Sequence, residues 1–237
     1  MINLNTGFYK DLDTNFEQAL EMSEKSFCHE ELINMLLEGN IPQKQIAALK
    51  LDKINNPKEA QILISNLTGC DGKIREAVAM KINYLLNSSI ELVDYFIYPE
   101  IFAQASIDIN ANICRLVLDS VSILIQNQKF QTDYIARILD YINEAFSELD
   151  KFIFRDKKYV INKQLFKLYW CLEALKLFVP HISMETLLPI LKKASEIKEY
   201  TIREKVAQII VQYNFSEFIE LKNTLINDEN YYVRNVF

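Results

Sequence analysis

Apolar residues recur at spacings of three and four along almost the whole of this 237-residue chain. That period is typical of one face of an α-helix. Short polar breaks divide the pattern, for example at residues 55–57 and 69–72. The pattern predicts an all-α fold, with helices near 14–27, 29–38, 42–55, 57–68, 73–87, 90–106, 111–127, 131–149, 158–178, 184–196, 200–213 and 215–226, and a last turn from about 230.

Two places carry the residue types that begin a helix. Asp13-Thr14-Asn15 and Ser183 have side-chain oxygens that can accept a hydrogen bond from a free N–H of the first helical turn. Pro189 falls inside the predicted helix 184–196. We expect it either in the first turns, where a missing N–H costs nothing, or at a kink.

The chain also repeats itself. Residues 74–79 read Ile-Arg-Glu-Ala-Val-Ala, and residues 202–207 read Ile-Arg-Glu-Lys-Val-Ala. Weaker copies begin near residues 43, 113, 161 and 233, and the middle ones share only the apolar spacing. Successive starts lie 31 to 48 residues apart. Each interval has room for two helices and two turns, which indicates a repeated helical hairpin.

The best copy, Asp71-Gly72-Lys73-Ile74-Arg75, resembles the start of the second helix in a HEAT repeat. Residues 199–203 and 230–234 fit this pattern in part, whereas Cys114 and Asn162 depart from it in the arginine position. The resemblance covers roughly residues 30–237. It implies a right-handed α-α superhelix (solenoid) of stacked antiparallel helix pairs, and it indicates an architecture rather than a function.

The resemblance also implies a domain organisation. A single hairpin cannot bury its second apolar flank alone, so neighbouring hairpins must cover each other. We expect residues 1–28 to form an N-terminal capping helix. Residues 29–237 would then form a HEAT-like array of about five units, with the last unit abbreviated or truncated.

Composition supports an all-helical fold and argues against a sheet-rich domain, a phosphate-binding loop and a general nucleic-acid binder. The chain has only four glycines. Tight hairpin turns and phosphate-binding loops both need glycine for backbone with positive φ, so a sheet-rich domain or a P-loop is not expected. The formal net charge of −6 argues against a general nucleic-acid binder, which must neutralise phosphates.

The cysteines bear on the compartment. Cys28, Cys70, Cys114 and Cys171 lie roughly forty residues apart, without metal-ligand spacing. We expect free, buried thiols in a reducing compartment. Residues 1–10 lack a secretory signal, and no apolar run is long enough to cross a membrane, so the cytoplasm is the default expectation.

Few residues suit catalysis. His29 and His181 are the only histidines. Cys28 and Glu30 adjoin His29, but adjacent helical residues point in different directions, so no metal site is expected there. His181 is expected in a turn exposed to solvent. With no nucleophile-histidine arrangement, we predict no catalytic residues, no enzyme activity, no metal and no cofactor.

The repeated arginines have two interpretations. They could bind an anion, or they could form a ladder in which each reaches an acidic residue or a backbone carbonyl of its own or the next unit. We favour the structural role, because Asp71 and Glu199 each lie four residues before an arginine. The predicted structural residues are Asp71, Ile74, Arg75, Glu199, Ile202, Arg203 and Arg234.

Positions outside the apolar stripe of the second helices should face a partner. In a solenoid these positions line the concave side. The candidate partner-binding residues are Glu76, Met80, Asn83, Arg115, Asp119, Lys163, Lys167, Trp170, Glu204 and Gln208. An exposed Trp170 would be a partner anchor. The equal alternative is that its bulk fills a gap between units.

These observations predict a non-catalytic scaffold that binds a protein or peptide on its concave face, and a small-molecule ligand is not expected. The first alternative is a nucleic-acid-binding protein similar to HEAT-like DNA glycosylases. Residues 150–158, which mix Phe with Arg155, Lys157 and Lys158, give it some support together with Lys163 and Lys167. The second alternative is a HEAT-like lyase, for which no cysteine- or histidine-centred site is apparent.

Overall fold

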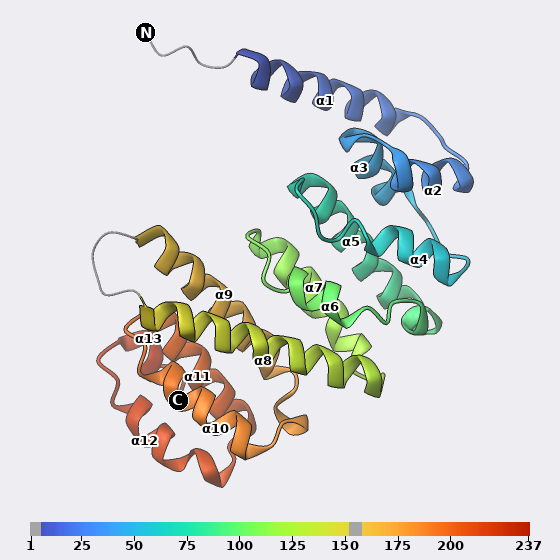
Figure 1. The fold of residues 1–237 in the computed structure, drawn as a ribbon. Coiled ribbons are helices and arrows are strands. Elements are labelled where there is room, and N and C mark those ends of the chain that lie inside the picture. The colour runs from blue at the N-terminus through green and yellow to red at the C-terminus, as the bar shows by residue number, and fades with distance from the viewer. Residues whose placement is uncertain (1–5, 152–157) are drawn as a thin grey trace. The chain divides into compact units, whose positions relative to one another are not determined.

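The computed structural model describes residues 6–151 and 158–237, and in this part of the chain every regular element is a helix (Figure 1). The all-α prediction is therefore confirmed. Arg155, Lys157 and the side chain of Lys158, which the sequence suggested for nucleic-acid contact, lie outside the described part. The chain divides into two compact units, residues 1–130 and 131–237.

The first unit is built of two sets of helices that pack in sequence order. Helices α1, α3, α5 and α7 form a row in which each packs on the next. Helices α2 and α4 and the 3₁₀ helix η1 pack against this row and in turn against each other, and α6 packs on α7. In chain order the elements are α1 (Thr6–Glu24), α2 (His29–Glu38), α3 (Ile41–Lys50), α4 (Pro57–Ile64), α5 (Gly72–Ser88), η1 (Ile90–Tyr95), α6 (Pro99–Ala105) and α7 (Ala111–Leu124).

The second unit has α11 at its centre, because this helix packs on α9, α10, α12 and α13. The face of α11 that contains Ile202, Val206, Ile209 and Ile210 is fully buried. The elements are α8 (Gln128–Lys151, which begins in the first unit), α9 (Lys158–Lys176), η2 (Val179–His181), α10 (Met184–Ser195), α11 (Tyr200–Tyr213), η3 (Ser216–Phe218), α12 (Ile219–Ile226) and α13 (Tyr231–Arg234).

Side-chain caps decide where several helices start. Ser183 caps α10 as predicted, since its hydroxyl oxygen accepts from the Thr186 N–H at 3.3 Å. The predicted cap at Asp13-Thr14-Asn15 is wrong, because α1 already begins at Thr6 and these residues lie inside it. The periodic pattern showed where α1 is amphipathic, not where its backbone becomes helical.

Proline also corrects a predicted boundary. The expected helix 90–106 is two elements, η1 and α6, and Pro99 is the first residue of α6. A proline disfavours helical backbone in the residue before it but suits the first helical position, where no N–H is needed. Pro189 lies inside α10 and is exposed.

The prediction that all four thiols are buried is half wrong. All four cysteines are free, and Cys114 and Cys171 are buried, but Cys28 and Cys70 are exposed. Cys28 is the N-cap of α2, and Cys70 lies just before Asp71, the N-cap of α5. Turns before helices stay at the surface because their backbone groups need water or caps. Among the described helices, none has the length and apolar character that crossing a membrane requires.

Candidate binding surface

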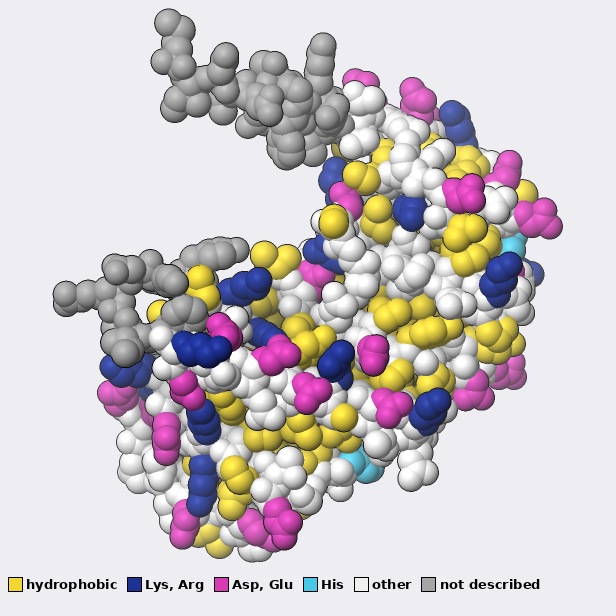
Figure 2. Space-filling view, in the orientation of Figure 1, with side chains coloured by type: hydrophobic (Ala, Val, Ile, Leu, Met, Phe, Trp, Pro, Cys, Tyr) yellow, Lys and Arg dark blue, Asp and Glu magenta, His cyan; other side chains and the backbone are white. Residues whose placement is uncertain are grey.

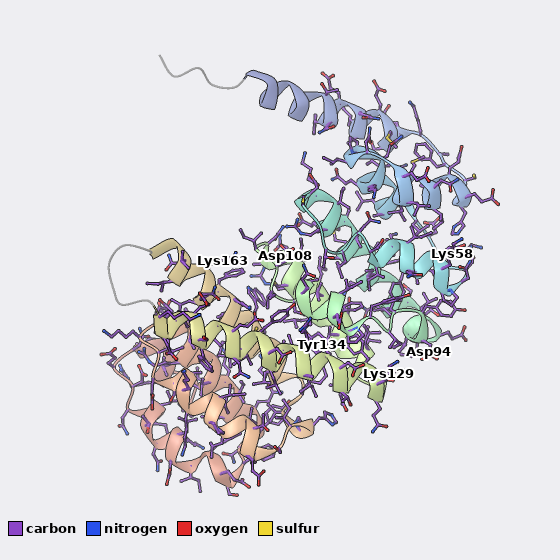
Figure 3. The ribbon with its side chains drawn as sticks, in the orientation of Figure 1. Lys58, Asp94, Asp108, Lys129, Tyr134 and Lys163 are labelled. Atoms are coloured by element: carbon purple, nitrogen blue, oxygen red, sulfur yellow. The ribbon has the colours of Figure 1, made fainter. Side chains whose placement is uncertain are left out.

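Arg75 joins α5 to the turn before α7, and these two helices are neighbours in the helix row of the first unit. It lies in the first turn of α5, and its Nε and Nη2 donate to Asp108 Oδ2 and Oδ1 at 2.6 and 3.2 Å. Its Nη1 donates to the Gly69 carbonyl at 2.7 Å. Asp108 lies in the turn before α7 and is labelled in Figure 3. Both side chains are nearly buried, so this bidentate pair ties α5 to the start of α7.

Arg203 makes the same set of contacts in the second unit. From α11 its Nε and Nη2 donate to Asp228 Oδ2 and Oδ1 at 2.7 and 3.0 Å, and its Nη1 donates to the Ile197 carbonyl at 2.9 Å. The hydrogen bonds from Arg203 hold the pKa of Asp228 below its ordinary value, although partial burial opposes this. We call each of these two arrangements an arginine clasp.

One part of the clasp occurs at four helix starts. The side chain four residues after the N-cap donates to the carbonyl two residues before that N-cap. Arg75 and Arg203 do so, Arg234 donates to the Asp228 carbonyl, and the Cys114 thiol donates to the Asp108 carbonyl at 3.1 Å. Cys114 thus keeps the local contact of the arginine position but cannot reach the next helix.

The carboxylates of the clasps differ from those that the sequence suggested. Asp71 caps α5 by accepting from the Lys73 and Ile74 N–H groups, and Glu199 accepts from the Thr201 hydroxyl. The missed residues are Asp108 and Asp228. Each stands two residues before an asparagine N-cap, and its Oδ1 also accepts from the N–H of that asparagine. This shared Asp-x-Asn was the available sequence signal.

The other predicted structural residues differ in burial. Ile202 is completely buried in the core of α11, and Ile74 is only partly buried at the start of α5. Arg234, on the short helix α13, is exposed.

Two candidate residues of α5 bridge to the loop and helix that follow rather than face solvent freely. Glu76 accepts from the side-chain amide of Asn112 at 3.4 Å, and Asn112 in turn accepts from Arg115 at 3.0 Å. The Asn83 amide donates to the Leu116 carbonyl at 3.3 Å. These hydrogen bonds help to fix the position of α5 along α7.

Met80 is different because it is exposed and makes no such bridge. It is 49% exposed, and four other large apolar side chains of the same helix row are exposed: Phe16 and Leu20 on α1 at 63% and 55%, Leu49 on α3 at 41% and Tyr84 on α5 at 59%. Figure 2 shows exposed hydrophobic patches lying between charged side chains on one side of the molecule. We call Leu49, Met80 and Tyr84 the apolar row. Asp119 on α7 is also exposed.

In the second unit most candidate residues are engaged. The Lys167 ammonium donates to Glu144 at 2.7 Å and lies 4.6 Å from the centroid of the Tyr141 ring. Gln208 accepts from Lys205 at 3.0 Å and donates to Glu204 at 3.3 Å. Lys163 remains exposed.

Trp170 is not a surface anchor. Only 5% of it is exposed, and its ring lies edge-on to Phe166 and Tyr169, at centroid distances of 6.2 and 5.3 Å. The prediction that it fills a gap between units stays a prediction, because both of these rings belong to its own helix, α9. A partner cannot contact the indole without displacing the packed core around it.

A half-buried charge cluster joins α9 to α11, and sequence reasoning missed it. Glu173 lies between two lysines, at 2.6 Å from Lys205 and 2.7 Å from Lys176. Lys205 also lies 4.7 Å from the centroid of the Tyr169 ring. Burial would raise the pKa of Glu173, but the hydrogen bonds and charges of Lys176 and Lys205 lower it. Burial would also lower the pKa of Lys205, but the hydrogen bond and charge of Glu173 raise it.

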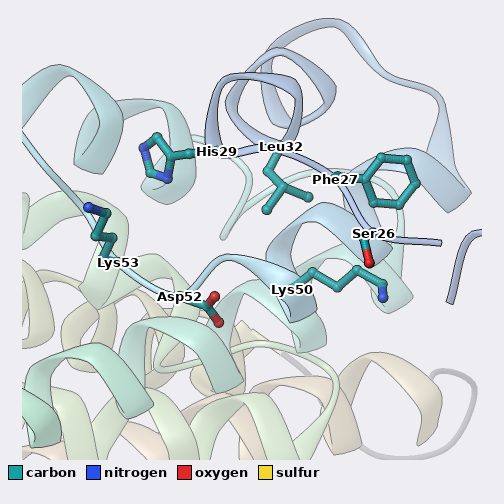
Figure 4. A pocket seen from close by; sticks show the side chains of 7 residues that line it. All are labelled: Ser26, Phe27, His29, Leu32, Lys50, Asp52 and Lys53. Atoms are coloured by element: carbon teal, nitrogen blue, oxygen red, sulfur yellow. The ribbon is translucent and has the colours of Figure 1, made fainter. Parts of the chain in front are cut away.

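His29 has a structural partner. Its Nε2 lies 3.0 Å from Glu59 Oε2, and Asn55 also contacts this nitrogen. The contact joins the start of α2 to the start of α4. Beside it is a pocket of about 290 Å³, which Figure 4 shows with Lys50 and Lys53 on either side of Asp52. No group of three metal-ligating side chains occurs among the described residues. His181 is exposed.

Comparisons with known proteins identify no family. No family model and no curated protein matches the chain. Two crystal structures of engineered proteins are similar to it in fold. The first is 12% identical with a TM-score of 0.44, covering 88% of this chain and 92% of that one. The second is 14% identical with a TM-score of 0.45, covering 89% and 96%.

Proposed function

We propose that this chain is a non-catalytic binding protein of HEAT-like repeats, stacked as a right-handed solenoid, and that it binds a protein or peptide on the exposed face of α3 and α5. The repeated contact at four helix starts supports the repeat architecture. A donor four residues after the N-cap and a carbonyl two residues before it recur at α5, α7, α11 and α13.

The apolar row is the observation that supports binding. Leu49, Met80 and Tyr84 are exposed, while the opposite faces of α3 and α5 are buried in a complete core. Single exposed apolar residues are ordinary, but neighbouring ones on packed helices mark interaction surfaces. A partner that covers these three side chains would bury apolar surface that the folded chain leaves in contact with water.

Site-specific photo-cross-linking tests the proposal. A benzophenone amino acid replaces Tyr84 in the full chain in its native cells, and a matched chain carries it at Lys58. Lys58 lies on α4, in the other set of helices, and is exposed (Figure 3). We expect a protein adduct from position 84 that Met80→Asp abolishes, and none from position 58. Equal adducts from both positions, or none from position 84, would contradict the proposal.

A further inference from the structure

Three lysines lie close in sequence to the residues of the apolar row. Lys50 and Lys81 directly follow Leu49 and Met80, at equivalent positions of α3 and α5, and Lys53 follows the end of α3. Lys81 lies 5.0 Å from the centroid of the Tyr84 ring. Partial burial lowers the pKa of Lys81, and the charge of Asp52 opposes that effect.

These lysines lack the close carboxylate partners that four lysines have in the second unit. There, Lys167, Lys176, Lys193 and Lys205 each have a carboxylate oxygen within 2.7 Å. By contrast, no carboxylate oxygen lies within 4.0 Å of Lys50, Lys53 or Lys81 among the described residues. The Lys50 ammonium donates to the Ser23 carbonyl at 2.8 Å.

We infer that the partner segment on this face is an acidic amphipathic helix, with apolar residues for the apolar row and carboxylates for Lys50, Lys53 and Lys81. This inference rests on the proposed function and specifies its partner. Charge complementarity carries it, since fixed positive charge beside exposed apolar surface favours a ligand with the opposite charge in the same arrangement.

The spacing of the row suits a helix. Leu49 and Met80 stand at equivalent positions of α3 and α5, which pack on each other, and the axes of packed helices lie about 8–10 Å apart. Two turns of a ligand helix rise about 10 Å, which lets apolar residues at i and i+7 face both. Glu or Asp residues that flank these apolar positions on the ligand helix would then face Lys50, Lys53 and Lys81.

The pocket beside Lys50 and Lys53 offers a place for one carboxylate. Its walls include Phe27 and Leu32 as well as these lysines, so it combines apolar contact with positive charge (Figure 4). Asp52 is its only acidic wall residue. The net negative charge of the whole chain does not cancel this local field, because charges beyond about 10 Å are screened at physiological salt.

A displayed peptide library tests the inference on the full chain. Each peptide is a helix of about 18 residues with leucine fixed at i, i+3, i+7 and i+10, and with Glu, Lys or Gln randomised at the flanking positions. We expect selection to enrich Glu over Lys. The best peptide should bind about tenfold more weakly to Lys53→Glu/Lys81→Glu, and equally well to the matched control Lys58→Glu.

The outcomes separate the inference from the proposed function. Enrichment of Lys or Gln, with binding still lost in Met80→Asp, would overturn the acidic partner while leaving a peptide-binding face. No enrichment, or binding unchanged in Met80→Asp, would overturn both. If a fluorescent single-stranded oligonucleotide binds more tightly than the best peptide, the ligand of this face is nucleic acid and the inference is overturned. If light scattering shows a dimer that the peptide dissociates, the occupant is a second copy of the chain, and the inference is likewise overturned.

Discussion

Arg75 and Asp108 form a bidentate ion pair between the first turn of α5 and the turn before α7, 33 residues apart in sequence. The pair is nearly buried, with 11% and 8% of the two side chains exposed. The arginine holds its own turn through Gly69 and the next turn through Asp108.

Arg75→Met should destabilise the first unit by about 3–5 kcal/mol, because it leaves the Asp108 carboxylate buried without its partner. Urea unfolding measures the loss, and hydrogen exchange should locate it at the starts of α5 and α7. Arg234→Met is the matched control, since Arg234 is exposed and pairs with no carboxylate of a following helix. Equal losses from both variants would show that the clasp has no special role.

The second clasp predicts a specific dependence on acid. The pKa of Asp228 is lowered in the folded chain, so its contribution to stability is present above the ordinary value of 3.8 and is lost as pH falls through the lowered value. We expect the stability of wild type to fall over this window more steeply than that of Arg203→Met. Parallel curves in acid denaturation at several urea concentrations would contradict the assignment.

The four thiols should divide into two classes. In the native chain Cys28 and Cys70 are exposed, while Cys114 and Cys171 are buried. Burial, together with the Asp108 charge, raises the pKa of Cys114 to about 12, which leaves almost no thiolate at neutral pH. Brief iodoacetamide treatment followed by mass spectrometry should show alkylation of Cys28 and Cys70 only. Rapid modification of Cys114 would mean that the start of α7 opens readily.

Glu173→Gln should destabilise the second unit by about 1–3 kcal/mol at neutral pH, because Lys205 and Lys176 lose the carboxylate they share. The raised pKa of Lys205 makes its contribution present below the ordinary value of 10.5 and lost as pH rises through the raised value. The difference between wild type and variant should therefore shrink in strong alkali. Thermal unfolding across this range tests it, and a constant difference would exclude the ionic origin.

Met80→Asp should change the free energy of unfolding by less than about 1 kcal/mol, because Met80 is 49% exposed and lies outside the core. Val78→Asp is the contrast, since Val78 is completely buried two positions earlier on the same helix. Equilibrium unfolding of both variants checks the assignment. A large loss from Met80→Asp would place Met80 in the core and remove it from the binding surface.

Local sequence was informative about helices and poor about long-range partners. The period of apolar residues placed α2, α5 and α11 within about two residues, because their buried faces follow the helical repeat. The same period predicted a single helix over residues 90–106 where the structure has η1 and α6, because apolar spacing does not show that Pro99 begins a new helix. Self-comparison found Arg75 and Arg203 but assigned them no correct acid, because Asp108 and Asp228 belong to the next helix start.

For the candidate surface too, local features were predicted correctly and long-range packing poorly. Met80 was predicted and is exposed, but Trp170 was offered as an anchor and is buried. Position in the repeat frame gives the direction of a side chain on its own helix. It does not show whether other parts of the chain cover that side chain, and only 5% of Trp170 is exposed.

From the amino-acid order alone follow the all-helical fold, the recurrence of Ile-Arg-Glu at residues 74 and 202, and the presence of only two histidines, because these depend on residue types and near-neighbour spacing. Tertiary structure alone decided which carboxylate each arginine holds, which thiols are shielded, and which lysines lack an acidic neighbour. The reason is physical: burial and ion pairing depend on distances between helices, and those distances are set only when the helices pack.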